Sequence, residues 1–350
     1  MPVRRQHDRE GHLDLGRAVA DPGTGRLFPL QPQAFDPARR RGCGRGWWTV
    51  KAIVAYRGGD DTPEALELGA TLRRTTGAEL VVVAVLPAVS ENPGADRVDL
   101  EYRQWLDSIA DQARRDAIAA LSPGTPESLE FRRVASTSVA DGLVRVADES
   151  GVDLLVLGSA RAATQGSLLV GSVSSRLLHS SPVPILLAPQ GYGGDPAATF
   201  GALTCAYAGT DRSREALAAA CELVKHYDGH LRVATFVPRA STMYPPEVGL
   251  DAEDMVAAQW AEQAIELHED ALAFCKNHGV TDVETAVARG RGWAGALNGI
   301  PWGPNDVLVL GSSRLGPLAR VFLGSTATKI LRHSPVPTLV VPSGTYTWSS

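Results

Sequence analysis

The residues whose types and spacing suggest chemistry lie in a stretch that this sequence contains twice. The first copy runs from Asp153 to Pro189 and the second from Asp306 to Pro342, at a constant offset of 153 residues. In each copy a loop opens with glycine, carries an arginine three residues later and ends in a Gly-Ser pair. The candidate site residues are Gly158, Arg161, Gly171, Ser172, Val173 and Ser174 in the first copy, and Gly311, Arg314, Gly324, Ser325 and Thr326 in the second.

Each Gly-Ser pair is a candidate anion site because a helix-like segment begins there. The first amide groups of a helix have no intrahelical partner and the helix dipole is positive at that end, so phosphate binds there readily. Glycine lets the backbone approach a ligand closely, and the hydroxyl of Ser172 or Ser325 adds a donor. The alternative is that the serine is only the N-cap. Neither loop is a Walker A loop, because no Gly-Lys-Ser/Thr ends it.

The other polar residues form no recognisable catalytic or metal-binding set. No Ser-His-Asp order, paired-carboxylate motif or metal-ligand spacing is present in the sequence. His179 and His333 lie near the ends of short helix-like segments, where a histidine interacts favourably with the negative end of the helix dipole. The acidic pair at Asp60 and Asp61 is typical of a solvated turn. We therefore expect neither catalytic nor metal-binding residues.

Length and composition limit the class of protein. A chain of 350 residues suits two domains, and 44% apolar with 21% charged residues is ordinary for a globular protein. The net charge of −5 argues against nucleic acid as a partner. Apolar runs fall far short of the roughly 20 residues that a membrane helix needs. Four cysteines without a CxxC motif favour inert thiols and a cytoplasmic location.

The elements that must position the Gly-Ser pairs alternate between buried strands and helices. Such alternation predicts parallel sheets with helices on both faces, and ligands of such sheets bind at the carboxyl ends of the strands. In the first half the expected strands are 50–56, 79–86, 128–135 and the repeated stretch, with helices at 62–75, 99–121 and 139–149. In the second half the expected strands are 199–207, 231–237, 282–288 and the repeated stretch, with helices after 211, at 252–277 and at 293–297.

The first 46 residues differ from the rest of the chain. They hold nine arginines against five acidic residues, a net of +4, which leaves −9 for the remainder. No strand or helix period is sustained there, so we expect disorder; the alternatives are a translation start near Val50 or a basic tail that binds a partner. The expected divisions are an extension at 1–46, a first domain at 47–190, a linker at 191–198, a second domain at 199–343 and a tail at 344–350.

With this motif and layout, the chain resembles the universal stress protein family in its tandem, two-domain form. Nucleotide-binding members carry Gly-x2-Gly-x9-Gly-Ser/Thr after the fourth strand. In the first copy Gly158 and the pair at Gly171 match this pattern at the expected spacing, and so do their counterparts in the second copy. The chain departs from the family at two points. The second glycine of the motif is replaced by Arg161 and Arg314, and the aspartate that ends the first strand is replaced by Arg57 and Ala208.

The resemblance implies a fold and a mode of assembly. The fold is α/β, with two repeated doubly wound parallel-sheet domains of the adenine nucleotide alpha hydrolase-like, Rossmann-like type, each of five strands with flanking helices. Family members pair through their last strands, so Val183–Leu187 and Thr338–Val341 are expected to pair within the chain as a pseudo-dimer. Further self-association into a homodimer and an unidentified protein partner are also implied.

The resemblance also implies a function, a cytoplasmic stress-response or regulatory protein that is not an enzyme. Its ligand is expected to be ATP or another adenine nucleotide, bound at the Gly-Ser helix starts. One alternative is a ligand-free scaffold that acts only through protein contacts. A second alternative is a slow ATP hydrolase with Ser172 or Ser325, and Arg161 or Arg314, around the γ-phosphate. The sequence leaves open which domain binds, what stress signal acts and which oligomer forms.

Overall fold

A computed structural model places the chain in two compact units, Met1–Gly46 and Trp47–Ser350. In the first unit, β1 (Ala18–Ala20) and β2 (Leu27–Pro29) pair antiparallel. The disorder expected for the rest of 1–46, and the tail at 344–350, lie outside the described residues. The structure describes residues 18–20, 27–29, 50–58, 63–88, 97–121, 129–160, 162–193, 195, 197–227, 229–239, 250–312 and 323–343.

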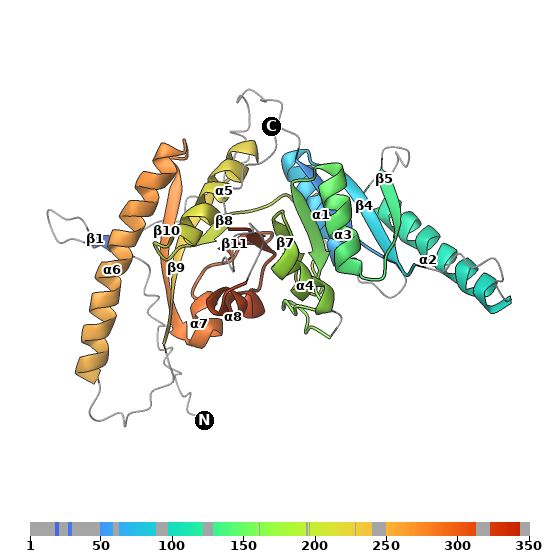
Figure 1. Cartoon of the computed structure of the whole chain (residues 1–350). Helices are drawn as coiled ribbons and strands as arrows, with labels where there is room; N and C mark the ends of the chain where they lie inside the picture. The colour runs from blue at the N-terminus through green and yellow to red at the C-terminus, as the bar shows by residue number, and fades with distance from the viewer. Residues whose placement is uncertain are drawn as a thin grey trace, which may run out of the picture. The chain divides into compact units, whose positions relative to one another are not determined.

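The second unit is built on one ten-stranded sheet (Figure 1). Each half contributes five parallel strands, and in each half the order along the sheet reverses between the first strand and the fourth. The first half has the order β7-β6-β3-β4-β5, from β3 (Lys51–Ala55), β4 (Glu79–Leu86), β5 (Glu130–Ala135), β6 (Leu154–Gly158) and β7 (Ile185–Ala188). The second half has the order β10-β9-β8-β11-β12, from β8 (Leu203–Ala206), β9 (Leu231–Arg239), β10 (Val283–Arg291), β11 (Val307–Gly311) and β12 (Thr338–Val341).

Helices cover both faces of this sheet, and a continuous apolar core fills each side. One core contains residues of α1, α2, α5 and α6, and the other contains residues of α3, α4, α7 and α8. Successive strand residues alternate between the two, as Ile53 and Val54 do. The helices are α1 (Glu64–Thr76), α2 (Arg97–Leu121), α3 (Val139–Ser150), α4 (Ser172–Ser180), α5 (Asp211–Tyr227), α6 (Leu250–Asn277), α7 (Gly292–Leu297) and α8 (Ser325–His333).

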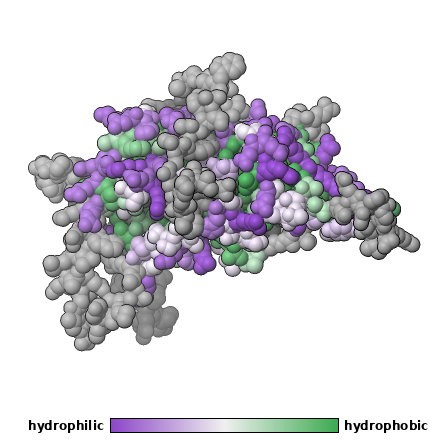
Figure 2. Space-filling model, in the orientation of Figure 1, coloured by the Kyte–Doolittle hydropathy of each residue, from purple (hydrophilic) through white to green (hydrophobic). Residues whose placement is uncertain are grey.

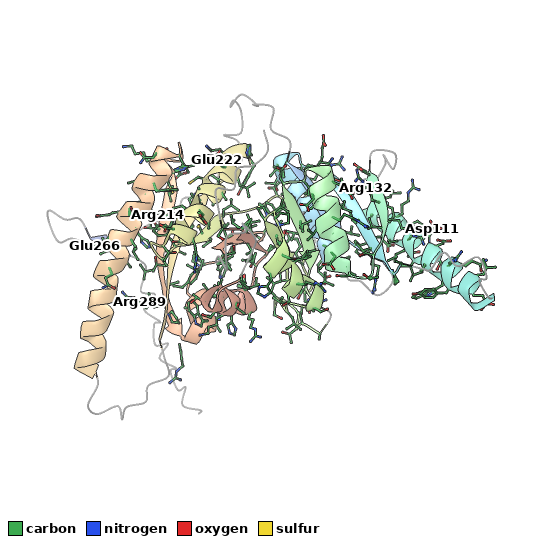
Figure 3. All side chains as sticks on the ribbon, in the orientation of Figure 1. Asp111, Arg132, Arg214, Glu222, Glu266 and Arg289 are labelled. Carbon is green, nitrogen blue, oxygen red and sulfur yellow. The ribbon has the colours of Figure 1, made fainter. Side chains whose placement is uncertain are left out.

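The outer surface is mainly polar. Hydrophilic side chains cover much of the described face in Figure 2, with smaller hydrophobic areas between them. Asp111 on α2, Glu266 on α6 and Arg289 on β10, labelled in Figure 3, are exposed. In the part of the chain that the structure describes, no helix is long and apolar enough to cross a membrane.

The two halves are joined by antiparallel pairing of β7 with β12. The pairing places Leu339 opposite Leu186 and Val340 opposite Ile185, and all four side chains are buried. This confirms the pairing that the family resemblance implies between the last strands, and the predicted fold class is confirmed with it. Hydrogen bonds outside the sheet also join the halves, for example from the Phe200 amide to the Thr75 hydroxyl at 2.9 Å.

Removing a side chain at this junction is expected to destabilise the protein strongly. Leu186 is 2% exposed and lies beside Leu339 in the core. Leu186→Ala should lower the free energy of unfolding by about 2–5 kcal/mol, because the cavity adds to the lost burial. Urea unfolding measures it. The control Leu272→Ala, at a side chain 38% exposed on α6, should stay within about 0.5 kcal/mol of wild type. Equal losses of unfolding free energy in the two variants would contradict the role given to this junction.

Candidate functional site

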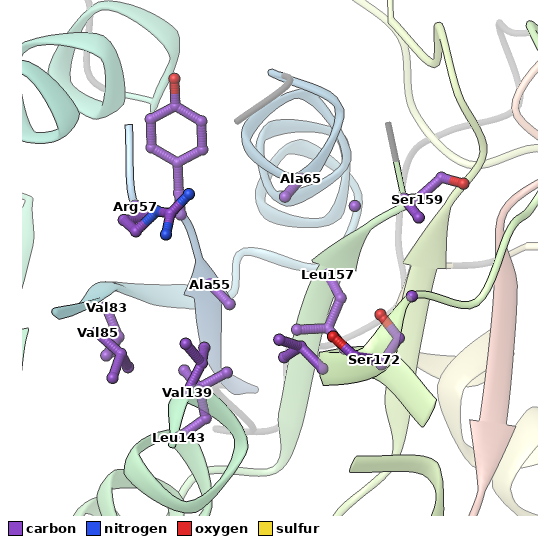
Figure 4. A pocket seen from close by; sticks show the side chains of 16 residues that line it. Ala55, Arg57, Ala65, Val83, Val85, Val139, Leu143, Leu157, Ser159 and Ser172 are labelled. Atoms are coloured by element: carbon purple, nitrogen blue, oxygen red, sulfur yellow. The ribbon is translucent and has the colours of Figure 1, made fainter. Parts of the chain in front are cut away.

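The first half has a pocket where the strand order reverses, at the carboxyl ends of β3 and β6. Its volume is about 270 Å³. Arg57, which follows β3, and Ser172, which begins α4, border it on opposite sides in Figure 4. An apolar wall closes the remaining side, made by Val83, Val85, Val139 and Leu143. The position agrees with the rule that ligands of doubly wound sheets bind at this switch point.

The second half has a pocket of the same construction, with a volume of about 360 Å³, at the ends of β8 and β11. Its wall differs from that of the first pocket. Phe236 stands where the first half has Val85, and Trp293, at the start of α7, also lines the second pocket. Its polar side is formed by Thr210, Arg212, Ser213, Ser325 and Thr326. The second pocket is therefore the one with an aromatic wall.

The helix starts at both pockets lack side-chain caps. The N-cap of α4 is Gly171 (φ −75°, ψ 177°) and that of α8 is Gly324 (φ −66°, ψ 163°), and neither helix has a capping side chain. The alternative in which the serine is the N-cap is therefore wrong, because Ser172 and Ser325 are already the first helical residues. By contrast, Ser138 caps α3 and accepts a hydrogen bond from an amide in its first turn.

The amide groups of these first turns line the pockets. The first intrahelical bond at α4 runs from the Ser175 amide to the Gly171 carbonyl at 2.8 Å, and the one at α8 from the Thr328 amide to the Gly324 carbonyl at 2.9 Å. The three residues before each donor therefore have no intrahelical acceptor for their amides. These residues are 172–174 and 325–327, and all of them line a pocket. Each pocket thus carries a positively polarised set of donors.

The structure brings most of the predicted site residues together. Arg161 and Arg314 lie outside the described residues, so nothing is placed for them. Gly311 also has a packing role, because a Cβ there would collide with the carbonyl oxygen of Arg212 at the start of α5. The first pocket is lined by Gly158, Gly171, Ser172, Val173 and Ser174, and the second by Gly311, Gly324, Ser325 and Thr326.

Sequence reasoning missed the pocket walls. The residues concerned end the second strand of each half, begin its third helix or, in the second half, lie at the start of its first helix, and they are distant in sequence from the Gly-Ser motif. The available signal was the rule that strand ends line such sites, applied to the second strand as well as to the first and fourth. The missed residues are Val83, Val85, Val139 and Leu143 in the first pocket and Thr210, Arg212, Ser213, Phe236 and Trp293 in the second.

A tyrosine in each pocket is tied to the long helix behind it. The Tyr56 hydroxyl donates to Asp116 at 3.0 Å, and the Tyr207 hydroxyl donates to Asp270 at 2.6 Å. Burial, with the hydrogen bond to Asp270, raises the pKa of Tyr207. The hydrogen bonds from Tyr207 and Arg214 in turn lower the pKa of Asp270. The pair therefore holds a neutral phenol beside a carboxylate, which fixes the ring in the wall of the pocket.

The chemistry of these pockets suits binding of an anion with an apolar portion. The uncapped amides and hydroxyls form one side, and the apolar or aromatic wall forms the other. Within the described residues, no group of three or more His, Cys, Asp or Glu side chains could hold a metal ion.

Comparison with known proteins defines the class of this α/β chain. A model of the universal stress protein family matches residues 50–189 and again 200–342. A universal stress protein of Mycobacterium tuberculosis is 39% identical over 295 residues, which cover 83% of this chain and 99% of that protein. The chain belongs to the universal stress protein family, in a form with two such domains in tandem.

Solved structures agree with the fold. A Pseudomonas aeruginosa structure described as a candidate universal stress protein covers 84% of this chain and 94% of its own, with 13% identity and a TM-score of 0.50. That likeness shows the fold. Another structure is described as a universal stress protein in complex with cAMP. It covers 40% of this chain and 96% of its own, at 24% identity and a TM-score of 0.30, and the cAMP is a property of that protein.

Stability is expected to fall in mild acid through His268. This side chain is 8% exposed, contacts the Thr235 hydroxyl at 3.1 Å, and has its pKa lowered by burial. The unfolded chain, with a histidine pKa of about 6.5, then binds more protons than the folded chain between that value and the lower folded pKa. The free energy of unfolding should therefore be highest above about pH 6.5 and decrease as the pH drops through that window.

The variant that tests this is His268→Gln, with wild type as the reference. Urea unfolding between pH 7.5 and 5 should show a smaller loss of stability for His268→Gln than for wild type. An unchanged pH dependence in the His268 variant would contradict the assignment. His226, whose pKa is also lowered by burial, adds to the pH dependence of stability in both proteins.

Proposed function

We propose that this universal stress protein is a stress-response regulatory protein that binds adenine nucleotides such as ATP, with phosphate at the starts of α4 and α8. The observation that carries the proposal is the pair of uncapped helix starts that open into pockets with an apolar wall. A helix start alone would attract any anion. The wall beside it adds a site for a flat apolar ring, and a nucleotide has both parts.

The phosphate side rests on the amides of 172–174 and 325–327. Hydrogen bonds from backbone amides to a charged acceptor contribute about 1.5–3 kcal/mol each, and the helix dipole adds a smaller term of the same sign. The hydroxyls of Ser172 and Ser325 supply further donors on exposed side chains. No basic side chain of the phosphate-binding loops is required for this mode of binding, because the donors belong to the backbone.

The base side favours the second pocket. Stacking of a base on an aromatic side chain contributes about 1–3 kcal/mol, and Phe236 and Trp293 provide such a wall. The volume of about 360 Å³ also falls within the usual range of small-molecule pockets, roughly 300–1,000 Å³, whereas the first pocket is slightly below it. We assign the tighter nucleotide site to the second half.

The proposal is binding without catalysis. The described residues that line the two pockets include no Asp, Glu or His side chain to take a proton from water. Arg57 and Ala208 stand where nucleotide-binding members of the family carry an aspartate. Recognition of the nucleoside would therefore depend on the walls rather than on a carboxylate.

The charge at the helix starts provides the test. Ser172→Asp and Ser325→Asp place a carboxylate where phosphate would bind, and a carboxylate in the first turn stabilises a helix, so folding is preserved. Ser172→Asn and Ser325→Asn are the neutral controls. Calorimetric titration with ATP should show binding by wild type and by the Asn variants. Each Asp variant should weaken its own site roughly tenfold or more, which is about 1.4 kcal/mol.

Three results would contradict the proposal. Absence of ATP, ADP and AMP binding by the wild-type chain at millimolar concentration would favour the ligand-free scaffold. Equal affinities of the Asp and Asn variants would place the nucleotide elsewhere. Steady release of phosphate by wild type, lost in the Asp variants, would instead support a slow ATP hydrolase.

Trp293 provides an optical test of the assignment to the second pocket. ATP should change the tryptophan emission of wild type, because the base covers the Trp293 ring. Trp293→Leu should remove that change and weaken binding at the tighter site roughly tenfold, from the lost stacking. Trp105→Leu is the matched control, since Trp105 is 55% exposed on α2 outside both pockets. If ATP changes the emission of Trp293→Leu as much as that of wild type, the base does not lie against this wall.

A further inference from the structure

Three cysteines that lie far apart in the sequence are buried in the second half. Cys205 on β8, Cys221 on α5 and Cys275 on α6 are all fully shielded from solvent. The thiol of Cys221 donates a hydrogen bond to the sulfur of Cys275, with 3.6 Å between the two Sγ atoms. The two residues are 54 positions apart, so their spacing gives no hint of this contact.

We propose that Cys221 and Cys275 form an oxidative modification site, at which a disulfide joins α5 to α6. The sulfurs are already in contact, and closing the bond requires an approach of about 1.5 Å to the usual S–S length of roughly 2.05 Å. Both side chains belong to the same apolar core and the packing already aims them at one another. The oxidant is a small two-electron acceptor such as hydrogen peroxide.

The reaction is balanced with peroxide as the only co-reactant. The Cys275 sulfur, as thiolate, attacks one peroxide oxygen; the O–O bond breaks, leaving a sulfenic acid and hydroxide, which takes a proton to become water. The Cys221 sulfur then attacks the Cys275 sulfur, its thiol proton passes to the leaving oxygen, and a second water departs. Two thiols are oxidised to one disulfide and one peroxide is reduced to two waters.

The hydrogen bond assigns the order of attack. By donating to Cys275, the Cys221 thiol lowers the pKa of Cys275, although burial opposes this effect. Burial raises the pKa of Cys205, which keeps that third cysteine a thiol. We therefore expect Cys275 to react first and Cys221 to resolve the sulfenic acid.

The first half provides an internal control. Its α1 and α2 correspond to α5 and α6, and the register follows from the matching hydrogen bonds of Tyr56 to Asp116 and Tyr207 to Asp270. In that register, the positions of the two cysteines hold Ala70 and Leu121. The modification is thus confined to the second half.

The disulfide would hold together the two helices, α5 and α6, that pack beside the second pocket. The helix α6 carries His268 and Asp270, which contact Thr235 and Tyr207 in the pocket wall. A covalent tie between α5 and α6 restricts their separation in the unfolded chain, so the oxidised protein should be more stable than the reduced one. This inference does not depend on whether the pocket binds a nucleotide.

The test is treatment of the full-length reduced protein with hydrogen peroxide, and in parallel with diamide, under native conditions. The protein is then alkylated in denaturant. Two of the four thiols should become unreactive, the intact mass before alkylation should fall by two hydrogens, and a peptide map should show Cys221 linked to Cys275, reversibly with dithiothreitol. Cys221→Ser and Cys275→Ser should each abolish the linkage, whereas Cys43→Ser and Cys205→Ser should retain it.

Thermal unfolding supplies a second readout. Oxidation should raise the melting temperature of wild type and of Cys205→Ser but not of Cys221→Ser. Four reactive thiols after treatment, or a bond that involves Cys43 or Cys205 or a second chain instead, would overturn the proposal. The wild-type peptide map decides the question even where a serine variant fails to fold.

Discussion

The antiparallel pairing of β7 with β12 is the interaction on which the rest of the second unit depends. Without it, each half would expose the backbone groups of its last strand along an open edge. With it, ten strands share one sheet, and both apolar cores contain residues of both halves. The strands within each half are parallel and the junction is antiparallel, so the strands of the two halves run in opposite directions. The carboxyl ends of the strands in one half therefore lie on the opposite side of the sheet from those in the other half. The two pockets are therefore separate sites.

The duplication preserved the backbone of these sites and varied their walls. Both halves reverse strand order at the same point, and in both a helix begins there with a glycine at the N-cap and no capping side chain. The side chains opposite the helix start differ, with valines in the first half and aromatic rings at Phe236 and Trp293 in the second. A ligand that both sites recognise through the backbone would thus be held with unequal affinity.

The sequence predicted the fold and the central motif because both depend on local signals. Near-continuous apolar runs mark buried parallel strands, as in Glu79–Leu86, and the repeated Gly-Ser pairs line the pockets as predicted. The pocket walls were not predicted, since Val83, Val139 and Ser172 are far apart in the sequence and only the strand order brings them to one pocket. The alternative with serine as the N-cap stayed open in the sequence because both serine and glycine are acceptable caps. The Cys221–Cys275 contact depends on helix packing across 54 residues, which no local pattern reports.

The central claim is that backbone amides at two helix starts hold the phosphate of a nucleotide. Hydrogen–deuterium exchange with and without ATP measures those amides directly. The account predicts slower exchange at residues 325–327 in the presence of ATP, slower exchange at 172–174 at higher ATP concentration, and no comparable change in α2, whose described residues line neither pocket. Exchange at both sets of amides that is unchanged by saturating ATP would contradict the account.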